Sequence, residues 1–361
     1  MKTFNLKTPN SRIYISENVF SEIKKFLKSS NYSNEKIFIL VDENTIQNCL
    51  PVLINEVEEL NKAEIIEIES GEENKTIDIC IQLWESLSEL NANRKSLLVN
   101  LGGGVIGDMG GFIASTFKRG MNFINIPTTL LSMVDASVGG KTGVDLNNIK
   151  NIIGVFNEPR AVFINPSFLN TLSQRQLLSG FAEILKHGLI ADKNYWNLIT
   201  SSNPDFHNPE YMSDLIYRSV EIKNDIVLKD PLEKDLRKIL NFGHTIGHAI
   251  ETLSLEKDKD PLLHGESVAI GLICESFLSV KYTNLDEAAL YSISSSIKSL
   301  YKHYPINKNL YNKLTDIMKK DKKNENQKIN FTLLKGIGNA EININCNIND
   351  IHQSLDYYNK L

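Results

Sequence analysis

The first half of the chain alternates short apolar runs with longer amphipathic segments, and this alternation limits the fold more than any other feature. Residues 36–42, 96–101, 123–126 and 161–164 have the length of strands, and Ile65 begins another apolar stretch. Continuous apolar runs of this length are typical of parallel strands buried on both faces. Strands separated by helical segments require crossover connections. The pattern therefore predicts a Rossmann-like, mostly parallel sheet with helices on both faces.

The second half of the chain has mainly helical periodicity. Ser173 and Gln176 have the spacing of a capping box at the start of a helix that extends to Ile190. Two short strands are expected near the end, at residues 328–334 and 340–345. Breaks in the helical pattern are expected around 201–209, 257–261 and 304–305.

The length of 361 residues exceeds the size at which one hydrophobic core keeps growing. We therefore expect two domains in an α/β protein. The predicted domains are an α/β domain over residues 1–172 and a mainly α-helical domain over residues 173–361. The active site is expected between them, where small-molecule sites are common.

Composition limits the class of partner. The net charge of −5 gives no reason to expect a nucleic-acid partner, and no apolar run has the length that spans a bilayer. The four cysteines form no closely spaced pair and are expected to be buried, reduced residues. Because no signal-peptide pattern follows Met1, a cytoplasmic location is expected.

A glycine pattern follows the predicted strand at 96–101. Gly102, Gly104 and Gly107 match Gly-x-Gly-x-x-Gly between a strand and a predicted helix. Such a turn lets the backbone approach a phosphate at the helix N-terminus. The alternative is close packing of helix on sheet. The acid usually found about 20 residues later is absent, so a bound dinucleotide would need another ribose acceptor, for which Asp42 is the natural candidate.

Three side chains share one face of a predicted helix at 240–251. His244 and His248 are four residues apart, and Glu251 continues the same row. His264 follows downstream. The group is typical of a metal site or a proton-transfer site, and the alternative is a solvated face or hydrogen-bonded core histidines.

Polar residues cluster in two further places. Lys141 and Asp135 suit a substrate loop, while the position of Asp135 excludes a complete P-loop, which needs glycine there. Glu183 and Lys186 are three residues apart on a predicted helix, where an exposed ion pair is the simplest alternative to a functional role.

Taken in order, these motifs resemble the 3-dehydroquinate synthase family, within the sugar phosphate cyclase superfamily. The resemblance extends from Asp42 to Lys323. It is carried by eight segments in the same order, Leu101–Asp108, Ile126–Leu131, Asp135–Lys141, Lys150–Asn151, Ala182–Lys186, Asn241–Glu251, His264–Glu266 and Asp321–Lys323.

The resemblance implies an NAD-dependent homodimer that also needs a divalent metal, zinc or cobalt. The enzyme is a carbon–oxygen lyase that converts the phosphorylated sugar acid 3-deoxy-D-arabino-heptulosonate 7-phosphate into 3-dehydroquinate and phosphate in the shikimate pathway. Transient oxidation, phosphate elimination, reduction, ring opening and aldol closure follow one another, and NAD is regenerated. Holding the open intermediate in one site favours its closure.

The resemblance also implies that the domain over 1–172 binds NAD and that the domain over 173–361 binds metal and substrate. It implies roles for individual residues as well. Glu183, His244 and His264 resemble the metal ligands, and His248 and Glu233 the proton-transfer residues. The implied NAD contacts are Asp42, Glu72, Lys75, Gly103, Gly104, Val105, Asp108, Thr128, Thr129, Lys150, Phe168, Leu169, Asn170 and Thr171. The implied substrate contacts are Arg119, which reaches the partner's site in the family, and Asp135, Lys141, Asn151, Lys186, Lys223, Arg237, Asn241 and one of Lys322 or Lys323.

Other functions remain as alternatives at this point. Relatives such as 2-deoxy-scyllo-inosose synthase and the sedoheptulose-phosphate cyclases have the same glycine and metal motifs but differ in substrate-loop residues. The cations Lys141, Lys150, Lys322 and Lys323 favour a substrate with a carboxylate. Polyol dehydrogenases, which release NADH, and a nucleotide-binding regulatory protein are more distant alternatives. Two local departures from the family are Gln176, where glutamate is frequent, and the irregular stretch 256–263 before His264.

Overall fold

The computed structural model describes residues 3–8, 10–30, 32–146, 149–320 and 329–361. The chain divides into two compact units, the first formed by Met1–Ser173 with Asp205–Asn224 and the second by Gln174–Pro204 with Asp225–Leu361. Compared with the expected division, residues 205–224 group with the first unit. Among the described residues, no helix combines the length and the apolar character needed to cross a bilayer.

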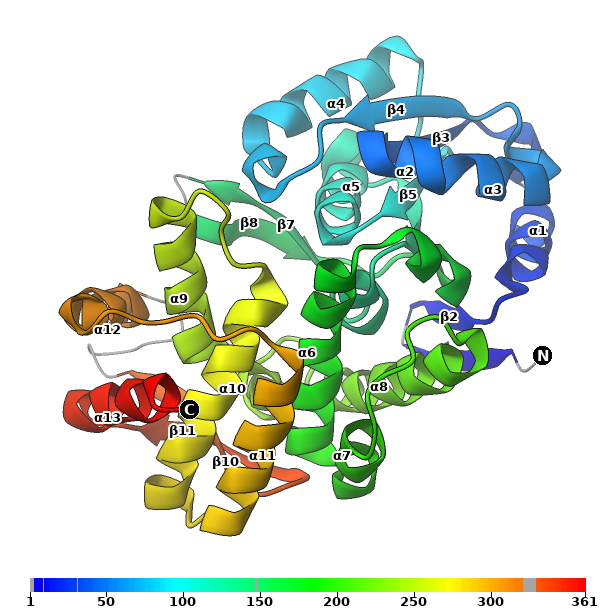
Figure 1. Cartoon of the computed structure of the whole chain (residues 1–361). Helices are drawn as coiled ribbons and strands as arrows, with labels where there is room; N and C mark the ends of the chain where they lie inside the picture. Colours follow the sequence, from blue (N-terminus) through cyan, green and yellow to red (C-terminus); the bar gives the residue numbers. More distant parts are fainter. Residues whose placement is uncertain (1–2, 9, 31, 147–148, 321–328) are drawn as a thin grey trace. The chain divides into compact units, whose positions relative to one another are not determined.

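A seven-stranded sheet forms the centre of the first unit (Figure 1). Its order is β1-β2-β9-β6-β5-β3-β4, and every neighbouring pair is parallel except β1 and β2. The strands are β1 (Phe4–Lys7), β2 (Arg12–Ile15), β3 (Ile37–Asp42), β4 (Glu64–Ile68), β5 (Leu97–Gly102), β6 (Asn122–Pro127) and β9 (Val162–Ile164). The parallel strands confirm the prediction from the apolar runs, whereas β1 and β2 were not predicted.

Helices pack on both faces of this sheet because successive strand residues point to opposite sides. Phe38 and Leu40 belong to a buried cluster with residues of α4 and α5, while Phe26 of α1 contacts the ring of Phe163 on β9. The helices of the first unit are α1 (Val19–Ser29), α2 (Glu43–Asn48), α3 (Leu50–Glu56), α4 (Ile77–Glu89) and α5 (Gly104–Thr116). Short helical turns occur at Tyr32–Asn34, Glu58–Leu60, Glu72–Asn74, Phe117–Arg119, Ser132–Ala136 and Pro166–Thr171.

A β-hairpin begins at Lys141, within the segment that was expected to be a substrate loop. Lys141–Leu146 (β7) and Ile149–Phe156 (β8) pair antiparallel, with Gly143 opposite Gly154. A Cβ atom on Gly143 would come within 2.5 Å of the Ile153 carbonyl oxygen, so the two backbones approach closely. The hairpin was missed because Gly143 and Gly154 interrupt the patterns of its two strands. Its apolar side chains, such as Val144, pack on the core formed by α4 and α5.

The second unit is mainly helical, as predicted. Its helices are α6 (Gln174–Ala191), α7 (Lys193–Thr200), α9 (His244–Lys257), α10 (His264–Thr283), α11 (Glu287–Leu300), α12 (Tyr311–Lys320) and α13 (Ile348–Asn359). The expected strand pair is confirmed as β10 (Asn330–Gly336) and β11 (Asn339–Asn345), and short turns occur at Leu236–Asn241 and Lys308–Leu310. Helix α8 (Pro209–Lys229) crosses the division between the units after Asn224.

All four cysteines are free thiols. Cys49, Cys80 and Cys274 are buried, as expected, and Cys346 is partly exposed. Burial raises the pKa of Cys49 and Cys80 to about 12. These thiols are therefore protonated and weakly reactive near neutral pH.

Candidate functional site

Three helices of the second unit bring one carboxylate and three imidazoles together. Glu183 lies on α6, His244 and His248 lie one turn apart on α9, and His264 is the first residue of α10. The ring centroids of the three histidines are 5.0–5.6 Å apart. Two of the imidazoles also face Glu183, whose Oε1 lies 3.5 Å from Nε2 of His244 and 3.6 Å from Nε2 of His264.

Glycines allow these helices to approach closely. A Cβ atom on Gly265, next to His264, would lie 1.8 Å from the Ser179 carbonyl oxygen of α6. A Cβ atom on Gly271 of α10 would lie 1.8 Å from the carbonyl oxygen of Gly243. Gly243 itself has φ +80°, a conformation that favours glycine, at the start of α9. The donor atoms therefore converge because α6 and α10, and α10 and the start of α9, are in backbone contact.

The two distances from Glu183 to the histidine nitrogens fit a small divalent metal. Ligands about 2.1 Å from a tetrahedral zinc ion lie about 3.4 Å from one another. The 3.5 and 3.6 Å separations are close to that value and are longer than normal hydrogen bonds. One carboxylate and two imidazoles also leave coordination positions open, as catalytic zinc sites do. A second ligand set is geometrically possible, because potential donor atoms of His244, His248 and His264 lie within 4.8 Å of one another.

Buried charge shapes the protonation of this cluster. Burial raises the pKa of Glu183, but Lys186, His244 and His264 lower it more, so this pKa lies well below its ordinary value. Burial lowers the pKa of His264, whereas Glu251 and Glu183 raise it more, to about 10. A metal bound by His264 must therefore displace a proton from the imidazole.

The remaining candidate residues of the second unit lie on three nearby segments. Lys186 is 1% exposed and forms an ion pair with Glu183, so the expected alternative of an exposed pair is wrong. Asn241 donates to Oε1 of Glu233 at 3.1 Å, and Glu233 has φ +56°. Arg237 is 2% exposed and donates from Nη1 to the carbonyl oxygen of Pro231. Lys322 and Lys323 lie outside the described residues.

The carboxyl edge of the first unit's sheet carries the glycine turn. Gly102 ends β5 opposite Pro127 of β6, and the backbone N–H of Thr128 donates to the Gly102 carbonyl oxygen. Asp42 ends the neighbouring strand β3, two residues beyond the pair formed by Leu40 and Asn100. Asp42, Gly103, Thr128 and Thr129 therefore meet at one edge, as expected for a site in such a sheet.

The two explanations for the glycines, a ligand-binding turn and close packing of the helix on the sheet, apply to different parts of helix α5. A Cβ atom on Gly107 would meet nothing within 4 Å, and one on Gly104 would meet only Ala136 at 3.6 Å. Close packing instead involves Gly110, where a Cβ atom would lie 2.0 Å from the Asn100 side chain. The start of α5 is thus open to a ligand, whereas its middle packs on the sheet. Asp42 also caps α2, because its Oδ1 accepts hydrogen bonds from Asn44 N and Thr45 N.

A buried lysine links three of the predicted cofactor segments. Lys75 is 2% exposed, and its Nζ lies 2.7 Å from Asp108 Oδ2 and 2.7 Å from Asn151 Oδ1. Glu72 lies 3.7 Å from Lys75 and 3.8 Å from Lys150. Burial lowers the pKa of Lys75, but the charges of Asp108 and Glu72 raise it more, so its pKa is raised overall and the ammonium stays charged. Burial raises the pKa of Asp108 even beside Lys75.

Two predicted substrate residues of the first unit are in direct contact. Lys223 of α8 donates to Oδ1 of Asp135 at 2.6 Å and to the Asp135 carbonyl oxygen at 2.6 Å. Lys141 is exposed at the start of β7. The segment Phe168–Thr171 lies in a short helical turn after β9, where Phe168 and Leu169 are buried.

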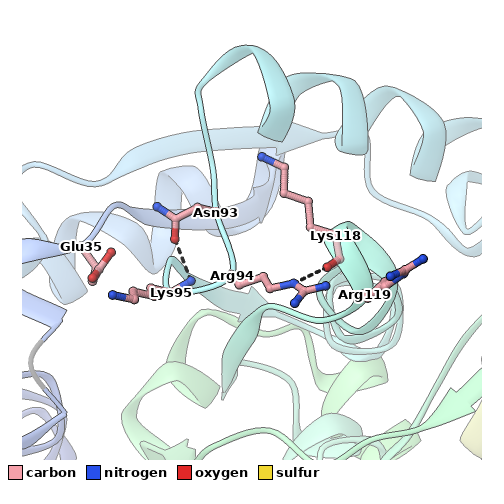
Figure 2. A pocket seen from close by; sticks show the side chains of 6 residues that line it. All are labelled: Glu35, Asn93, Arg94, Lys95, Lys118 and Arg119. Atoms are coloured by element: carbon pink, nitrogen blue, oxygen red, sulfur yellow. Dashed lines mark hydrogen bonds between the residues drawn. The ribbon is translucent and has the colours of Figure 1, made fainter.

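Arg119 lies apart from these contacts, in a strained turn. Lys118 and Arg119 have φ +48° and +68°, which costs energy for residues other than glycine. Arg94 Nε donates to the Lys118 carbonyl oxygen at 2.7 Å and holds this turn (Figure 2). Arg94 and Arg119 line an open pocket of about 850 Å³ together with Glu35, Asn93, Lys95 and Lys118. Arg119 is exposed there.

The sequence reasoning missed the residues that hold the candidate ligands in place. Arg175 donates from Nε and Nη2 to both carboxylate oxygens of Glu266, at 2.9 and 2.8 Å, in the first turn of α10. Glu275 is fully buried and accepts from the backbone N–H groups of Gly243 and Ile246. The capping position of Glu266, three residues after Leu263, was the only local signal for these partners.

Two family models match the chain. A model described as 3-dehydroquinate synthase N-terminal covers residues 65–179, and one described as 3-dehydroquinate synthase C-terminal covers residues 180–324. Among curated proteins, 3-dehydroquinate synthase of Parabacteroides distasonis is 45% identical over 96% of this chain and 97% of its own length. That of Thermoanaerobacter pseudethanolicus is 38% identical over 94% and 95%.

A solved structure has the same fold. It is 2-deoxy-scyllo-inosose synthase complexed with carbaglucose-6-phosphate, NAD⁺ and Co²⁺, with a TM-score of 0.87 and 22% identity over 98% of this chain and 99% of that one. At that identity the likeness establishes the architecture alone.

Proposed function

The chain belongs to the 3-dehydroquinate synthase family, and on that basis we propose that it converts 3-deoxy-D-arabino-heptulosonate 7-phosphate into 3-dehydroquinate and inorganic phosphate. The reaction is a phosphate elimination coupled to ring closure. It depends on NAD and on a divalent metal such as zinc or cobalt.

The observation that carries this proposal is the convergence of Glu183, His244 and His264. In the proposal these three residues hold the metal, through one carboxylate oxygen and the two Nε2 atoms. The fully buried carboxylate supports this assignment, because a buried anion needs compensation by cations. The buried charge of Glu183 and the family resemblance favour this set over the three histidines alone. When bound, the metal and NAD supply Lewis acidity and reversible hydride acceptance, respectively.

The proposed NAD contacts are supported by the open start of α5. Glycines 103 and 104 let a pyrophosphate approach free backbone N–H groups at the N-terminus of this helix. Asp42, at the end of the adjacent strand, is placed to accept from a ribose hydroxyl. The other proposed contacts on the surrounding segments are Glu72, Lys75, Val105, Asp108, Thr128, Thr129, Lys150 and Phe168–Thr171.

The substrate carries a carboxylate and a phosphate, and the proposed contacts provide cations for both. Lys223 is oriented by Asp135, and Lys186 keeps Glu183 ionised. The remaining proposed substrate contacts are Arg119, Lys141, Asn151, Arg237, Asn241 and one of Lys322 or Lys323.

Two residues are proposed to move protons. His248 lies one helical turn from His244, with its ring beside the other two imidazoles, so it can take up a hydroxyl proton without serving as a ligand. Glu233 accepts a hydrogen bond from Asn241, which holds its carboxylate beside a proposed substrate contact.

Phosphate release tests the substrate assignment. Purified protein incubated with heptulosonate phosphate, catalytic NAD and zinc is expected to release one phosphate per dehydroquinate formed, without accumulation of NADH. His264→Ala protein is the control. If glucose 6-phosphate or sedoheptulose phosphate reacts and the heptulosonate does not, the substrate assignment is wrong. A lasting rise in nicotinamide absorbance with a simple polyol would instead indicate a dehydrogenase.

A further inference from the structure

Glu251 remains without a role in the proposed reaction, although it lies on the same face of α9 as His244 and His248. Its side chain is 6% exposed. Oε2 of Glu251 lies 3.3 Å from Nδ1 of His264, which belongs to the first turn of α10. The carboxylate thus links α9 to the imidazole of a different helix.

The two ring nitrogens of His264 face different carboxylates. Nε2 lies 3.6 Å from Glu183 Oε1, and Nδ1 faces Glu251. His244 has the same arrangement, with Nε2 toward Glu183 and Nδ1 at 3.1 Å from the Phe242 carbonyl oxygen. In both imidazoles the nitrogen turned away from Glu183 has an oxygen acceptor. An acceptor at Nδ1 fixes the tautomer in which Nε2 carries the free electron pair.

The backbone of His264 is fixed by other contacts. Glu266 accepts from Leu263 N at 2.7 Å and is held by Arg175, and Gly265 N donates to Ser179 Oγ at 3.1 Å. These bonds set the start of α10 but leave the imidazole free to rotate about its side-chain bonds. The His264 side chain is 25% exposed, compared with 10% for His244 and 0% for Glu183. Of the two imidazoles that face Glu183, the more exposed one is therefore the one that Glu251 contacts.

We propose that Glu251 is a positioning residue for His264, with its carboxylate accepting the Nδ1–H and holding Nε2 toward Glu183. The inference rests on the proposed metal site. Glu251 is not itself a ligand in this proposal, because it contacts the nitrogen on the far side of the ring from Glu183. Orienting carboxylates of this kind typically change metal affinity by about 10- to 100-fold.

Metal binding to the purified full-length protein tests the proposal independently of turnover. The apparent Kd for Zn²⁺ is measured by competition with a chromogenic chelator for wild type, Glu251→Ala and Glu251→Gln. We expect Kd to rise about 10- to 100-fold in Glu251→Ala. A smaller rise is expected in Glu251→Gln, because its amide oxygen still accepts from Nδ1. Glu256→Gln is the matched control on α9, with an exposed carboxylate paired to Lys313, and its Kd should not change.

Three outcomes would overturn the proposal. The first is a Kd within twofold of wild type in both Glu251 variants. The second is a change in the Co²⁺ d–d spectrum of metal-saturated Glu251→Gln, because such a change would indicate that Glu251 coordinates the ion directly. The third is wild-type affinity in His264→Ala, which would also contradict the proposed metal site.

Two comparisons keep the test decisive. If Glu251→Ala does not fold, the near-isosteric Glu251→Gln variant decides. If His264→Ala loses metal binding while both Glu251 variants bind as wild type, only the positioning role is overturned.

Discussion

At the residue level, each unit contains a buried pair of opposite charges among its candidate residues. Glu183 is compensated by Lys186 and two imidazoles, and Lys75 is compensated by Asp108. Removing one partner of such a buried ion pair lowers the stability of the folded protein by several kcal/mol, because the other charge stays buried. The imidazoles in the same cluster can divide their tasks, since each has two distinct ring nitrogens.

The division of labour between the histidines gives a first prediction. His264→Ala should lose zinc and turnover while the far-ultraviolet circular dichroism stays that of wild type. His248→Ala should retain zinc, with kcat lower by about 10²- to 10⁴-fold because general acid–base catalysis is lost. Zinc content and steady-state rates measure both effects. Zinc loss in His248→Ala would instead make His248 a ligand, as the alternative three-histidine set requires.

Asp350 gives a prediction about stability and pH. This carboxylate is 3% exposed and accepts hydrogen bonds from Lys281, Tyr282 and Asn347. Burial raises the pKa of Asp350, but these contacts lower it more, so its pKa in the folded protein lies below the ordinary value. Its contribution to stability is therefore present above the unfolded-state pKa of about 3.9 and is lost as pH falls through the folded-state pKa.

Asp350→Asn should accordingly lower the free energy of unfolding of the second unit by about 1–3 kcal/mol at pH 7. The difference from wild type should shrink as the pH falls below about 4. The chain has two tryptophans, so in a Trp84→Phe background the fluorescence of Trp196 reports the second unit during urea unfolding. Asp316→Asn is the control, since this carboxylate is 64% exposed. A difference that does not depend on pH would contradict the assignment.

At the level of elements, the site depends on backbone contacts between helices. The start of α10 lies against Ser179 of α6, and Gly271 of α10 lies against Gly243 at the start of α9. Helices in such contact transmit a small shift directly to the side chains they carry, because protein interiors are close-packed. By contrast, the start of α5 has open space where a ligand is proposed, so its glycines meet few protein atoms.

This contrast predicts opposite effects of two glycine substitutions. Gly265→Ala should destabilise the second unit by about 1–3 kcal/mol, because the added Cβ forces α10 away from α6. Its zinc affinity should fall with the displacement of His264. Gly107→Ala should leave stability unchanged or raise it by about 0.5–1 kcal/mol, because alanine favours a helix interior. Urea unfolding and zinc titration measure both variants, and equal stability of Gly265→Ala and wild type would contradict the packing argument.

At the level of the whole molecule, the family resemblance leads us to propose a homodimer in which Arg119 of one subunit acts in the site of the other. Arg119 is exposed in a strained turn that Arg94 holds. Such strain persists only where surrounding contacts maintain it, and it often occurs at functional sites.

Mixed dimers test this prediction. Arg119→Ala and His264→Ala proteins should each be nearly inactive alone. After unfolding and refolding as a 1:1 mixture they should recover about a quarter of wild-type activity, because half of the dimers are mixed and each contains one complete site. Size-exclusion chromatography provides the control for assembly. No recovery by a mixture that forms dimers would contradict an action of Arg119 across the interface.

Local sequence patterns are sufficient to predict the class of fold and the chemistry of the candidate histidines. Apolar runs and helical spacing predict β3, β4, β5, β6 and β9 and most helices of the second unit, because periodicity is a local property of the chain. The residue types at Glu183, His244 and His264 indicate metal-binding chemistry wherever they meet. The family resemblance, carried by ordered motifs, brought these distant positions into one hypothesis.

Packing between distant segments sets which of these groups are in contact and which of them orient the others. Glu251 continues a row of histidines on α9 in the sequence, yet it contacts His264 of α10, while Glu183 arrives from α6. The hairpin β7–β8 and the buried Lys75 were likewise not visible in local patterns. The reason is that contacts between distant segments depend on backbone packing, such as that of Gly265 on Ser179, which no sequence periodicity records.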